Sequence, residues 1–402
     1  MNPETKERIL QSVDSLRDET LDFLRELVQT ESYNPPGDTR NIIEVVKRKT
    51  RTFPVSVTCP SSDPEKLNIL LSCGGERGSH LLFNSHLDTV PPGDPSQWKG
   101  GPLSGAIYQG NLFGRGAADA KGSGAAMVMA QKALVLAGVK IGGKLTVNLV
   151  ADEETGGALG TRLIRDQNLV SPDFVVIGEI TGNRIATAEK GTLIMEVTTH
   201  GRSAHASTPW EGINAISKMA SLLTRLEADQ LQKFARRRHP LTPPPSINFG
   251  TITGGVKSNM VADVCKVTID RRTLPNEDTE TALKEIQEVI ENLAKEDPEF
   301  NARIQVLRTG SPIDTPLNSP LVRYAQHACS LLGLPAEPVG YAQASDGRFF
   351  AEKDIPTILI GPGKASQAHT VNESVEIDQV IEASRLYALL AFLILNPQDK
   401  ET

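Results

Sequence analysis

Short apolar runs alternate with helix-like segments over much of the chain. Between residues 4 and 31, apolar residues recur at helical spacing until the sequence YNPPGD ends the pattern. Continuous apolar runs predict buried strands at residues 67–72, 80–85, 144–150, 173–178 and 355–361. Helices are predicted at residues 122–138, 159–169, 320–332 and 378–394. This alternation of strands and helices favours an α/β domain with a mostly parallel sheet.

The middle of the chain has a different pattern, in which apolar and polar residues alternate with period two. It predicts strands at residues 191–201, 246–255, 260–272 and 302–310, with helices at about 210–234 and 277–296. The order β-α-β-β-α-β is that of a ferredoxin-like α+β fold, with helices on one face of its sheet. We therefore expect an α/β domain made of residues 1–189 and 313–402, with a small α+β domain inserted at 190–312.

The net charge and the hydropathy of the chain argue against nucleic acids and membranes as partners. The formal net charge is −7, whereas a nucleic-acid-binding protein needs a basic surface. No apolar run approaches the roughly 20 residues of a membrane span, and the polar start MNPETKERIL lacks the apolar region of a secretory signal. We expect a cytoplasmic protein with neither a nucleic-acid nor a membrane partner.

Histidines and carboxylates gather where the predicted strands end. Because ligands of open α/β sheets bind beyond the carboxyl ends of the strands, these side chains are expected at one edge. Carboxylates do not converge in a low-dielectric cleft without positive charge between them, so a pair of divalent ions is expected. Zinc binds both histidine nitrogen and carboxylate oxygen, and imidazole also suits cobalt. The residues are His86, Asp88, Asp152, Glu153, Glu154, Glu179 and His369, with Asp119 just before a glycine-rich helix start.

Two pairs of nearby residues suggest a division of roles. His86 and Asp88 are two apart on a strand and face the same way, so the Asp88 carboxylate is expected to accept a hydrogen bond from His86. One carboxylate must stay off the metals to take a proton from water. Successive side chains in extended backbone point to opposite sides, so Glu153 and Glu154 can supply one base and one ligand.

These segments resemble a known enzyme family. The sequences NSHLDTVPPG, GRGAADAKG, ADEETGG, GEITG, GRSAHASTPWEGINAI, SNMVADVCKVTIDRRTLP, SDGRFF and GPG…AHTVNES occur in the order found in the di-zinc aminoacylase and carboxypeptidase family. That family includes acetylornithine deacetylase, succinyl-diaminopimelate desuccinylase and glutamate carboxypeptidase. The resemblance implies a phosphorylase/hydrolase-like catalytic α/β domain and a ferredoxin-like lid and dimerisation domain.

The resemblance also implies a role for each residue of the metal site. His86 and Glu179 would bind one ion, Glu154 and His369 the other, and Asp119 both, with a cis peptide bond after it. Two divalent ions are implied, with zinc expected and cobalt or manganese as alternatives. Asp88 would orient His86, and Glu153 would be the general base.

Further residues are implied to contact substrate. His205, on the inserted domain, would reach the active site of the partner in a homodimer and stabilise an oxyanion. Asn259 and Arg272 would hold the substrate carboxylate, with backbone N–H groups offered by Gly361 and Gly363. Arg271 is an alternative to Arg272, although the frame D-x-R-x-x-P favours Arg272. Arg348 could bind substrate or a structural carboxylate. The family usually has proline where this chain has Ala262 and Val371, which bears on substrate fit and leaves the metal site unaffected.

The sequence thus predicts a metal-dependent amidohydrolase acting on N-acylated amino acids, of the acetylornithine deacetylase or succinyl-diaminopimelate desuccinylase type. A metallocarboxypeptidase or dipeptidase of the same family is an alternative, because the metal ligands are the same. A non-catalytic, dimeric metal-binding protein is another, although such a protein has no use for an unligated Glu153. A serine hydrolase and a single-zinc protease are disfavoured, since neither G-x-S-x-G nor H-E-x-x-H occurs.

Overall fold

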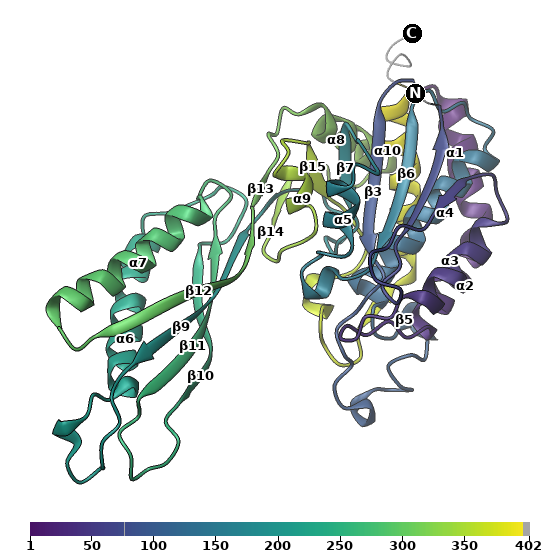
Figure 1. Cartoon of the computed structure of the whole chain (residues 1–402). Coiled ribbons are helices and arrows are strands. Elements are labelled where there is room, and N and C mark those ends of the chain that lie inside the picture. The colour runs from purple at the N-terminus through teal and green to yellow at the C-terminus, as the bar shows by residue number, and fades with distance from the viewer. Residues whose placement is uncertain (76, 397–402) are drawn as a thin grey trace. The chain divides into compact units, whose positions relative to one another are not determined.

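A computed structural model describes residues 1–75 and 77–396 (Figure 1). Its contacts divide the chain into two compact units. The first comprises Met1–Thr187, Thr315–Val339 and Ser345–Thr402, and the second comprises Ala188–Asp314 and Gly340–Ala344. The structure shows an α/β fold with a separate small antiparallel sheet. That the second unit serves as a lid and dimerisation domain stays a prediction.

The first unit contains most of the residues of a mixed sheet. The strand order is β1 (Ser56–Thr58), β2 (Ile69–Gly74), β6 (Lys144–Val150), β3 (His80–His86), β7 (Phe174–Ile177), β15 (Thr357–Leu359), β8 (Ala186–Glu189) and β13 (Ile313–Asp314), with β14 (Val339–Tyr341) also pairing with β8. The four strands from β6 to β15 are parallel, and the flanking pairs are antiparallel. Every residue of β3 is buried, as expected of a central parallel strand covered on both faces. The carboxyl ends of the four parallel strands therefore share one edge.

Helices cover both faces of this sheet. The main apolar core joins one face to α1 (Pro3–Ser15), α2 (Arg17–Gln29), α3 (Arg40–Thr50), α4 (Gly122–Leu136), α8 (Pro320–Leu332) and α10 (Ile377–Leu395). On the other face, α5 (Thr161–Asp166) packs against Leu70 and Val150 and contacts α9 (Arg348–Ala351). The helical pattern predicted from residue 4 to 31 is interrupted at Leu16, whose backbone (φ −96°, ψ 6°) ends α1. Among the described residues, none of the helices combines the length and apolarity needed to cross a membrane.

The first unit also has a small antiparallel sheet, with the order β16 (Ser374–Glu376), β5 (Asn111–Phe113) and β4 (Ala106–Tyr108). In this sheet the hairpin of β4 and β5 pairs with the segment before α10. Short helical turns lie in the loops of the described residues: η1 (Pro95–Gln97), η2 (Ala117–Lys121), η3 (Glu153–Thr155), η4 (Pro209–Glu211) and η5 (Ala365–Gln367).

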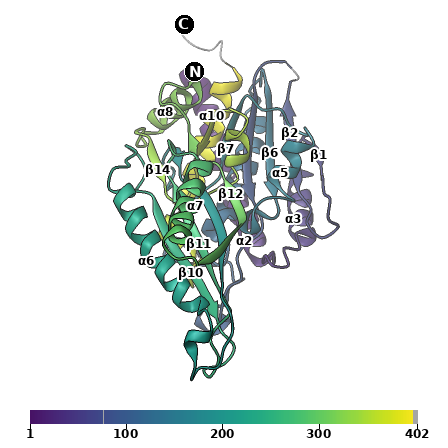
Figure 2. The same ribbon diagram turned by 60° about the vertical axis from the view of Figure 1, so that its left-hand side comes forward.

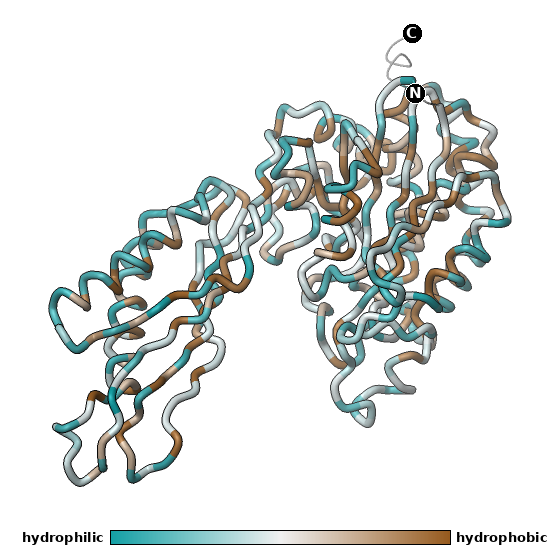
Figure 3. The backbone as a smooth tube through the Cα atoms, in the orientation of Figure 1, coloured by the Kyte–Doolittle hydropathy of each residue, from teal (hydrophilic) through white to brown (hydrophobic). Residues whose placement is uncertain are grey.

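The second unit has the predicted β-α-β-β-α-β order. Its strands are β9 (Gly191–His200), β10 (Ser246–Gly254), β11 (Val264–Thr273) and β12 (Asn301–Gly310), in the antiparallel order β10-β11-β9-β12. Its helices, α6 (Ala215–Phe234) and α7 (Thr279–Glu296), lie on one face of the sheet (Figures 1 and 2). Hydrophobic residues recur between hydrophilic ones along α7, as Figure 3 shows, and those on its inner face join the core of this unit.

Candidate metal centre

His86 is the last residue of β3, and its side chain is buried. Its Nδ1 lies 2.9 Å from the backbone carbonyl oxygen of Asp88, which can only accept a hydrogen bond. Nδ1 therefore carries a proton, and Nε2, 3.1 Å from Asp119 Oδ1, donates its own proton to that carboxylate oxygen in the metal-free protein. Burial lowers the pKa of His86, but the hydrogen bond and charge of Asp119, with nearby carboxylates, raise it well above its usual value. A metal ion bound by His86 Nε2 and Asp119 would take the place of the proton on Nε2.

The carboxylate of Asp88 does not make the hydrogen bond to His86 that the sequence predicts. Its Oδ1 lies 3.7 Å from His86 Nδ1, because the backbone carbonyl of the same residue already occupies that nitrogen. The carboxylate instead accepts hydrogen bonds from the backbone N–H groups of Glu153 and Glu154, at 3.2 Å each, and from Asn34 Nδ2 at 2.8 Å. Burial raises its pKa to about 6. Asp88 thus orients His86 through its backbone and holds the turn at residues 153–154 through its side chain.

Asp119 lies in η2, directly before α4. The peptide bond between Asp119 and Ala120 is cis, as the family resemblance implies. Burial raises the pKa of Asp119, but the hydrogen bond from His86 and the charges of His86 and His369 lower it below its usual value. The side chain is therefore a carboxylate with one oxygen near each histidine, at 3.1 Å from His86 Nε2 and 3.5 Å from His369 Nε2.

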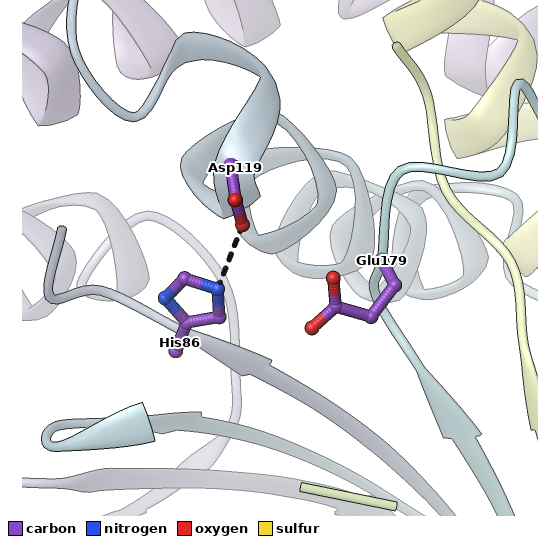
Figure 4. Close-up of side chains that lie close together, drawn as sticks. All are labelled: His86, Asp119 and Glu179. Carbon is purple, nitrogen blue, oxygen red and sulfur yellow. Dashed lines mark hydrogen bonds and ion pairs between the residues drawn. The ribbon is translucent and has the colours of Figure 1, made fainter. Parts of the chain in front are cut away.

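Two groups of three residues share Asp119. His86, Asp119 and Glu179 form one group, and Asp119, Glu154 and His369 form the other. Within each group, one ligand atom per residue lies within 4.8 Å of the others. Figure 4 shows the Glu179 carboxylate directed toward the His86–Asp119 pair. The structure thus brings together all five residues that the sequence predicts as metal ligands.

Glu153 and Glu154 follow β6 in a tight turn, so the extended backbone assumed from the sequence is wrong. Asp152 precedes the turn in a left-handed conformation (φ 76°), and residues 153–155 form η3. The turn arises because Asp88 binds both backbone N–H groups. The two side chains nevertheless diverge: Glu154 Oε2 lies 3.1 Å from His369 Nε2, whereas Glu153 belongs to neither group.

Glu153 is close to a buried arginine whose role the sequence leaves open. Arg348 Nη1 lies 4.0 Å from Glu153 Oε1, and Arg348 Nη2 lies 3.3 Å from Asp346 Oδ1. Arg348 also donates to the carbonyl oxygens of Ser345 and Gly156. Burial and the charge of Asp346 raise the pKa of Glu153 well above its usual range, while His86 and Arg348 oppose this. Arg348 therefore binds a structural carboxylate and places positive charge beside Glu153.

Two buried residues that support the site are absent from the sequence prediction. Asn34 donates to both Asp88 Oδ2 and Thr155 Oγ1, and Glu373 accepts hydrogen bonds from the backbone around Asp119. Glu373 lies within the motif AHTVNES, and Asn34 lies in the helix-ending sequence YNPPGD. The sequence shows a polar residue at both positions, but it does not show their hydrogen-bond partners, which are distant along the chain.

The predicted N–H donors in the GPG turn already have acceptors within the protein. Gly361 N–H donates to Thr181 Oγ1 at 3.1 Å, and Gly363 N–H donates to Gln379 Oε1 at 2.9 Å. A Cβ at position 361 would lie 2.3 Å from Ser123 Oγ and 2.4 Å from the carbonyl oxygen of Glu179. Close packing thus explains the glycine at 361. Substrate binding by these two glycines stays a prediction.

The remaining predicted residues lie on the second unit. The backbone N–H of Ser207 donates to His205 Nδ1 at 3.2 Å, so Nδ1 needs its lone pair and the proton sits on Nε2. The backbone carbonyl oxygen of Asn259 accepts a hydrogen bond from the N–H of Ala206, the residue after His205. Arg272 forms a two-pronged pair with Asp270, at 2.8 and 3.0 Å. Arg271 is fully buried and bonds Gln230 and Glu277, which leaves Arg272 as the accessible arginine.

Comparisons with known proteins agree with this architecture. Residues 82–392 match the family described as peptidase family M20/M25/M40. Acetylornithine deacetylase from Proteus mirabilis is 30% identical over 87% of each chain, and that from Erwinia tasmaniensis is 31% identical over 81% of this chain and 82% of its own.

Solved structures show the same fold at lower identity. A tripeptidase from Staphylococcus aureus superposes with a TM-score of 0.77 at 22% identity, covering 95% of this chain and 99% of its own. An M20 family metallo-carboxypeptidase from Sulfolobus solfataricus gives 0.76 at 20% identity, covering 94% and 99%. The extent of the family match and the identity to the two deacetylases place this chain in peptidase family M20/M25/M40, as a metallo-hydrolase.

Proposed function

We propose that the protein hydrolyses the amide bond of N-acylated amino acids, as a deacylase of the acetylornithine deacetylase or succinyl-diaminopimelate desuccinylase type. One observation carries the proposal: two histidine–carboxylate groups share Asp119, and Glu153 lies beside them as a member of neither. The names of the two relatives at 30 and 31% identity support a deacylase over a peptidase.

The donor atoms fit two divalent ions. His86 and Glu179 would hold one, Glu154 and His369 the other, and Asp119 would be a ligand shared by both. Once a metal displaces its Nε2 proton, His86 supplies a neutral imidazole, which together with the carboxylates forms a donor set suited to zinc; cobalt or manganese would also fit. Two such ions would lower the pKa of a water held between them and polarise the substrate carbonyl.

Glu153 is placed to move the proton of the reaction. Its carboxylate takes a proton from the attacking water as the water oxygen bonds to the amide carbon. The C–N bond then breaks, and Glu153 gives the proton to the departing nitrogen, which leaves an amine and a carboxylic acid that releases its remaining proton at neutral pH. The raised pKa of Glu153 favours holding that proton between the two transfers, and the positive charge of Arg348 keeps the carboxylate form accessible.

The second unit is proposed to contribute to substrate binding. The Nε2–H of His205 would donate to the oxyanion that develops on the carbonyl oxygen. Arg272 and Asn259 would hold the substrate carboxylate, because a guanidinium binds two carboxylate oxygens at once. The proposal includes a homodimer formed through this unit, in which His205 acts in the site of the partner subunit.

Hydrolysis of a substrate panel tests the proposal. The panel holds N-acetyl-ornithine, N-succinyl-diaminopimelate, N-acetyl-methionine, a glutamate amide and several dipeptides, each assayed with zinc, with cobalt and with a chelator. We expect chelator-sensitive cleavage of an N-acyl amino acid. Cleavage of dipeptides alone would replace the deacylase by a peptidase, and bound metal without any cleavage would favour a non-catalytic protein.

A further inference from the structure

Glu373 is a fully buried carboxylate that belongs to neither candidate metal group. It directly precedes β16 and accepts four hydrogen bonds from the segment that ends at Asp119. Oε2 accepts from Arg115 Nη1 at 2.8 Å and from the N–H of Gly116 at 3.0 Å. Oε1 accepts from the N–H groups of Ala118 and Asp119, at 2.9 and 3.0 Å. The backbone before Asp119 thus folds around a single side chain.

The charge of Glu373 is balanced within the protein. Arg115 is itself buried, with its guanidinium 2.8 Å from Glu373 and 5.1 Å from the centre of the Trp98 ring. Three backbone N–H groups share the same carboxylate. Removal of the carboxylate would leave Arg115 buried without its ion-pair partner and three N–H groups without their acceptor. The loop would have to move for these groups to find other partners.

The backbone around Glu373 joins the segments that carry two of the candidate ligands. The carbonyl oxygen of Glu373 accepts from Gly114 N–H at 3.0 Å, and β16 pairs with β5 directly before that glycine. His369 lies four residues before Glu373 on the same segment. One residue therefore connects the loop of Asp119 to the loop of His369, whose ring nitrogen lies 3.5 Å from the Asp119 carboxylate.

We propose that Glu373 is a positioning residue for the metal centre, which sets the separation of Asp119 and His369 by holding both of their segments. This inference rests on the proposed metal roles of those two residues. Glu373 contacts no reacting atom, so its effect reaches the chemistry through the ligands. Outer residues that orient metal ligands typically contribute about 10–100-fold to metal affinity or activity.

Cobalt binding tests the inference without an activity assay. Metal-free wild type and Glu373→Gln are titrated with cobalt, and the absorption spectrum, affinity and number of ions per chain are recorded. Glutamine keeps the volume but removes the charge and turns an NH₂ group toward N–H donors. Glu277→Gln is the matched control, because Glu277 is a largely buried carboxylate that binds Arg237, Arg271 and the N–H of Leu274 in the second unit.

We expect Glu373→Gln to weaken cobalt binding about 10–100-fold and to change the cobalt spectrum, and Glu277→Gln to leave both unchanged. If Glu373→Gln does not fold, the same titration is carried out on Glu373→Asp, which keeps the charge but has a side chain shorter by one methylene group. Cobalt affinity and spectrum like wild type would overturn the inference, even with a lowered melting temperature. Wild type that binds two cobalt ions but cleaves nothing would overturn only the proposed function, whereas wild type that binds none would overturn both.

Discussion

Adjacent glutamates in the η3 turn have different surroundings, and this difference defines their proposed roles. Glu154 lies 3.1 Å from His369 and accepts a hydrogen bond from the N–H of Val90. Glu153 faces Arg348, and burial raises its pKa. The same backbone turn, fixed by Asp88, thus presents a candidate ligand and a candidate base.

Replacement of Glu153 by glutamine is expected to separate chemistry from metal binding. Glutamine cannot accept the proton of the attacking water, so kcat should fall by about 10²–10⁴-fold. The number of bound metals, measured by elemental analysis, should stay unchanged, while Glu154→Gln should lose metal. Turnover near the wild-type rate would show that Glu153 is not the base.

Asp152 gives a prediction about pH at the start of the same turn. Burial raises its pKa, but hydrogen bonds from Thr155 and Leu159 and the Lys66 ammonium lower it below its usual value of 3.8. A lowered pKa means that the charged side chain stabilises the folded state above that value, and that this contribution is lost as the pH falls through the lowered pKa.

The substitution Asp152→Asn should therefore reduce the free energy of unfolding of the metal-free protein by roughly 1–2 kcal/mol at neutral pH. The deficit should shrink as the pH falls below 3.8. Urea unfolding across this range measures it, with the exposed Asp22→Asn as a control that changes little. A deficit independent of pH would contradict the assignment.

At the scale of elements, the close approach of the GPG turn to α4 and to the segment after β7 makes Gly361 sensitive to substitution. A Cβ there would meet both Ser123 Oγ and the Glu179 carbonyl oxygen at less than 2.5 Å. Gly361→Ala should lower the free energy of unfolding by about 1–3 kcal/mol and weaken metal binding, because the backbone of Glu179 must shift.

Gly75→Ala serves as the control for this substitution. Its Cβ would have an ordinary contact, 3.5 Å from the carbonyl oxygen of Gly142, and it lies on a different loop. Urea unfolding and cobalt titration of the two variants provide the comparison. Equal effects at both positions would show that the packing at Gly361 is looser than the structure indicates.

The sequence predicts the elements whose patterns are local. β6, α8 and the edge at which the parallel strands end follow from periodicity, and so does the gathering of histidines and carboxylates at that edge. The choice of five metal ligands among them rests on the family resemblance. The sequence prediction omits α3, although Ile42, Ile43 and Val46 lie on one helical face. It misassigns the backbone of Glu153 and Glu154, because that turn is set by Asp88, which is distant in sequence. The same distance hides the roles of Asn34 and Glu373.

At the scale of the molecule, each unit has its own apolar core. All five candidate ligands belong to the first unit. A ligand that binds only the folded state stabilises the part of the protein that holds it, by about 2.7 kcal/mol when its concentration is 100 times its dissociation constant.

Calorimetry should therefore show two transitions, of which a chelator lowers only one. The affected transition is that of the first unit, and its midpoint should recover when zinc or cobalt is restored. Glu277→Gln, in the second unit, should lower the midpoint of the other transition. The two results together assign each transition to one unit. A chelator that lowers both equally would show that the units unfold together.

The division of the first unit along the chain bears on the order in which the site can form during synthesis. Four candidate ligands, up to Glu179, precede the second unit, and His369 follows it. At about 5–20 residues per second, the ribosome needs roughly 10–40 s to add the residues between them. During that interval the nascent chain contains four candidate ligands, and His369 has not yet been synthesised. A metal bound early would therefore be held weakly, and tight binding requires the synthesis of the segment that carries His369.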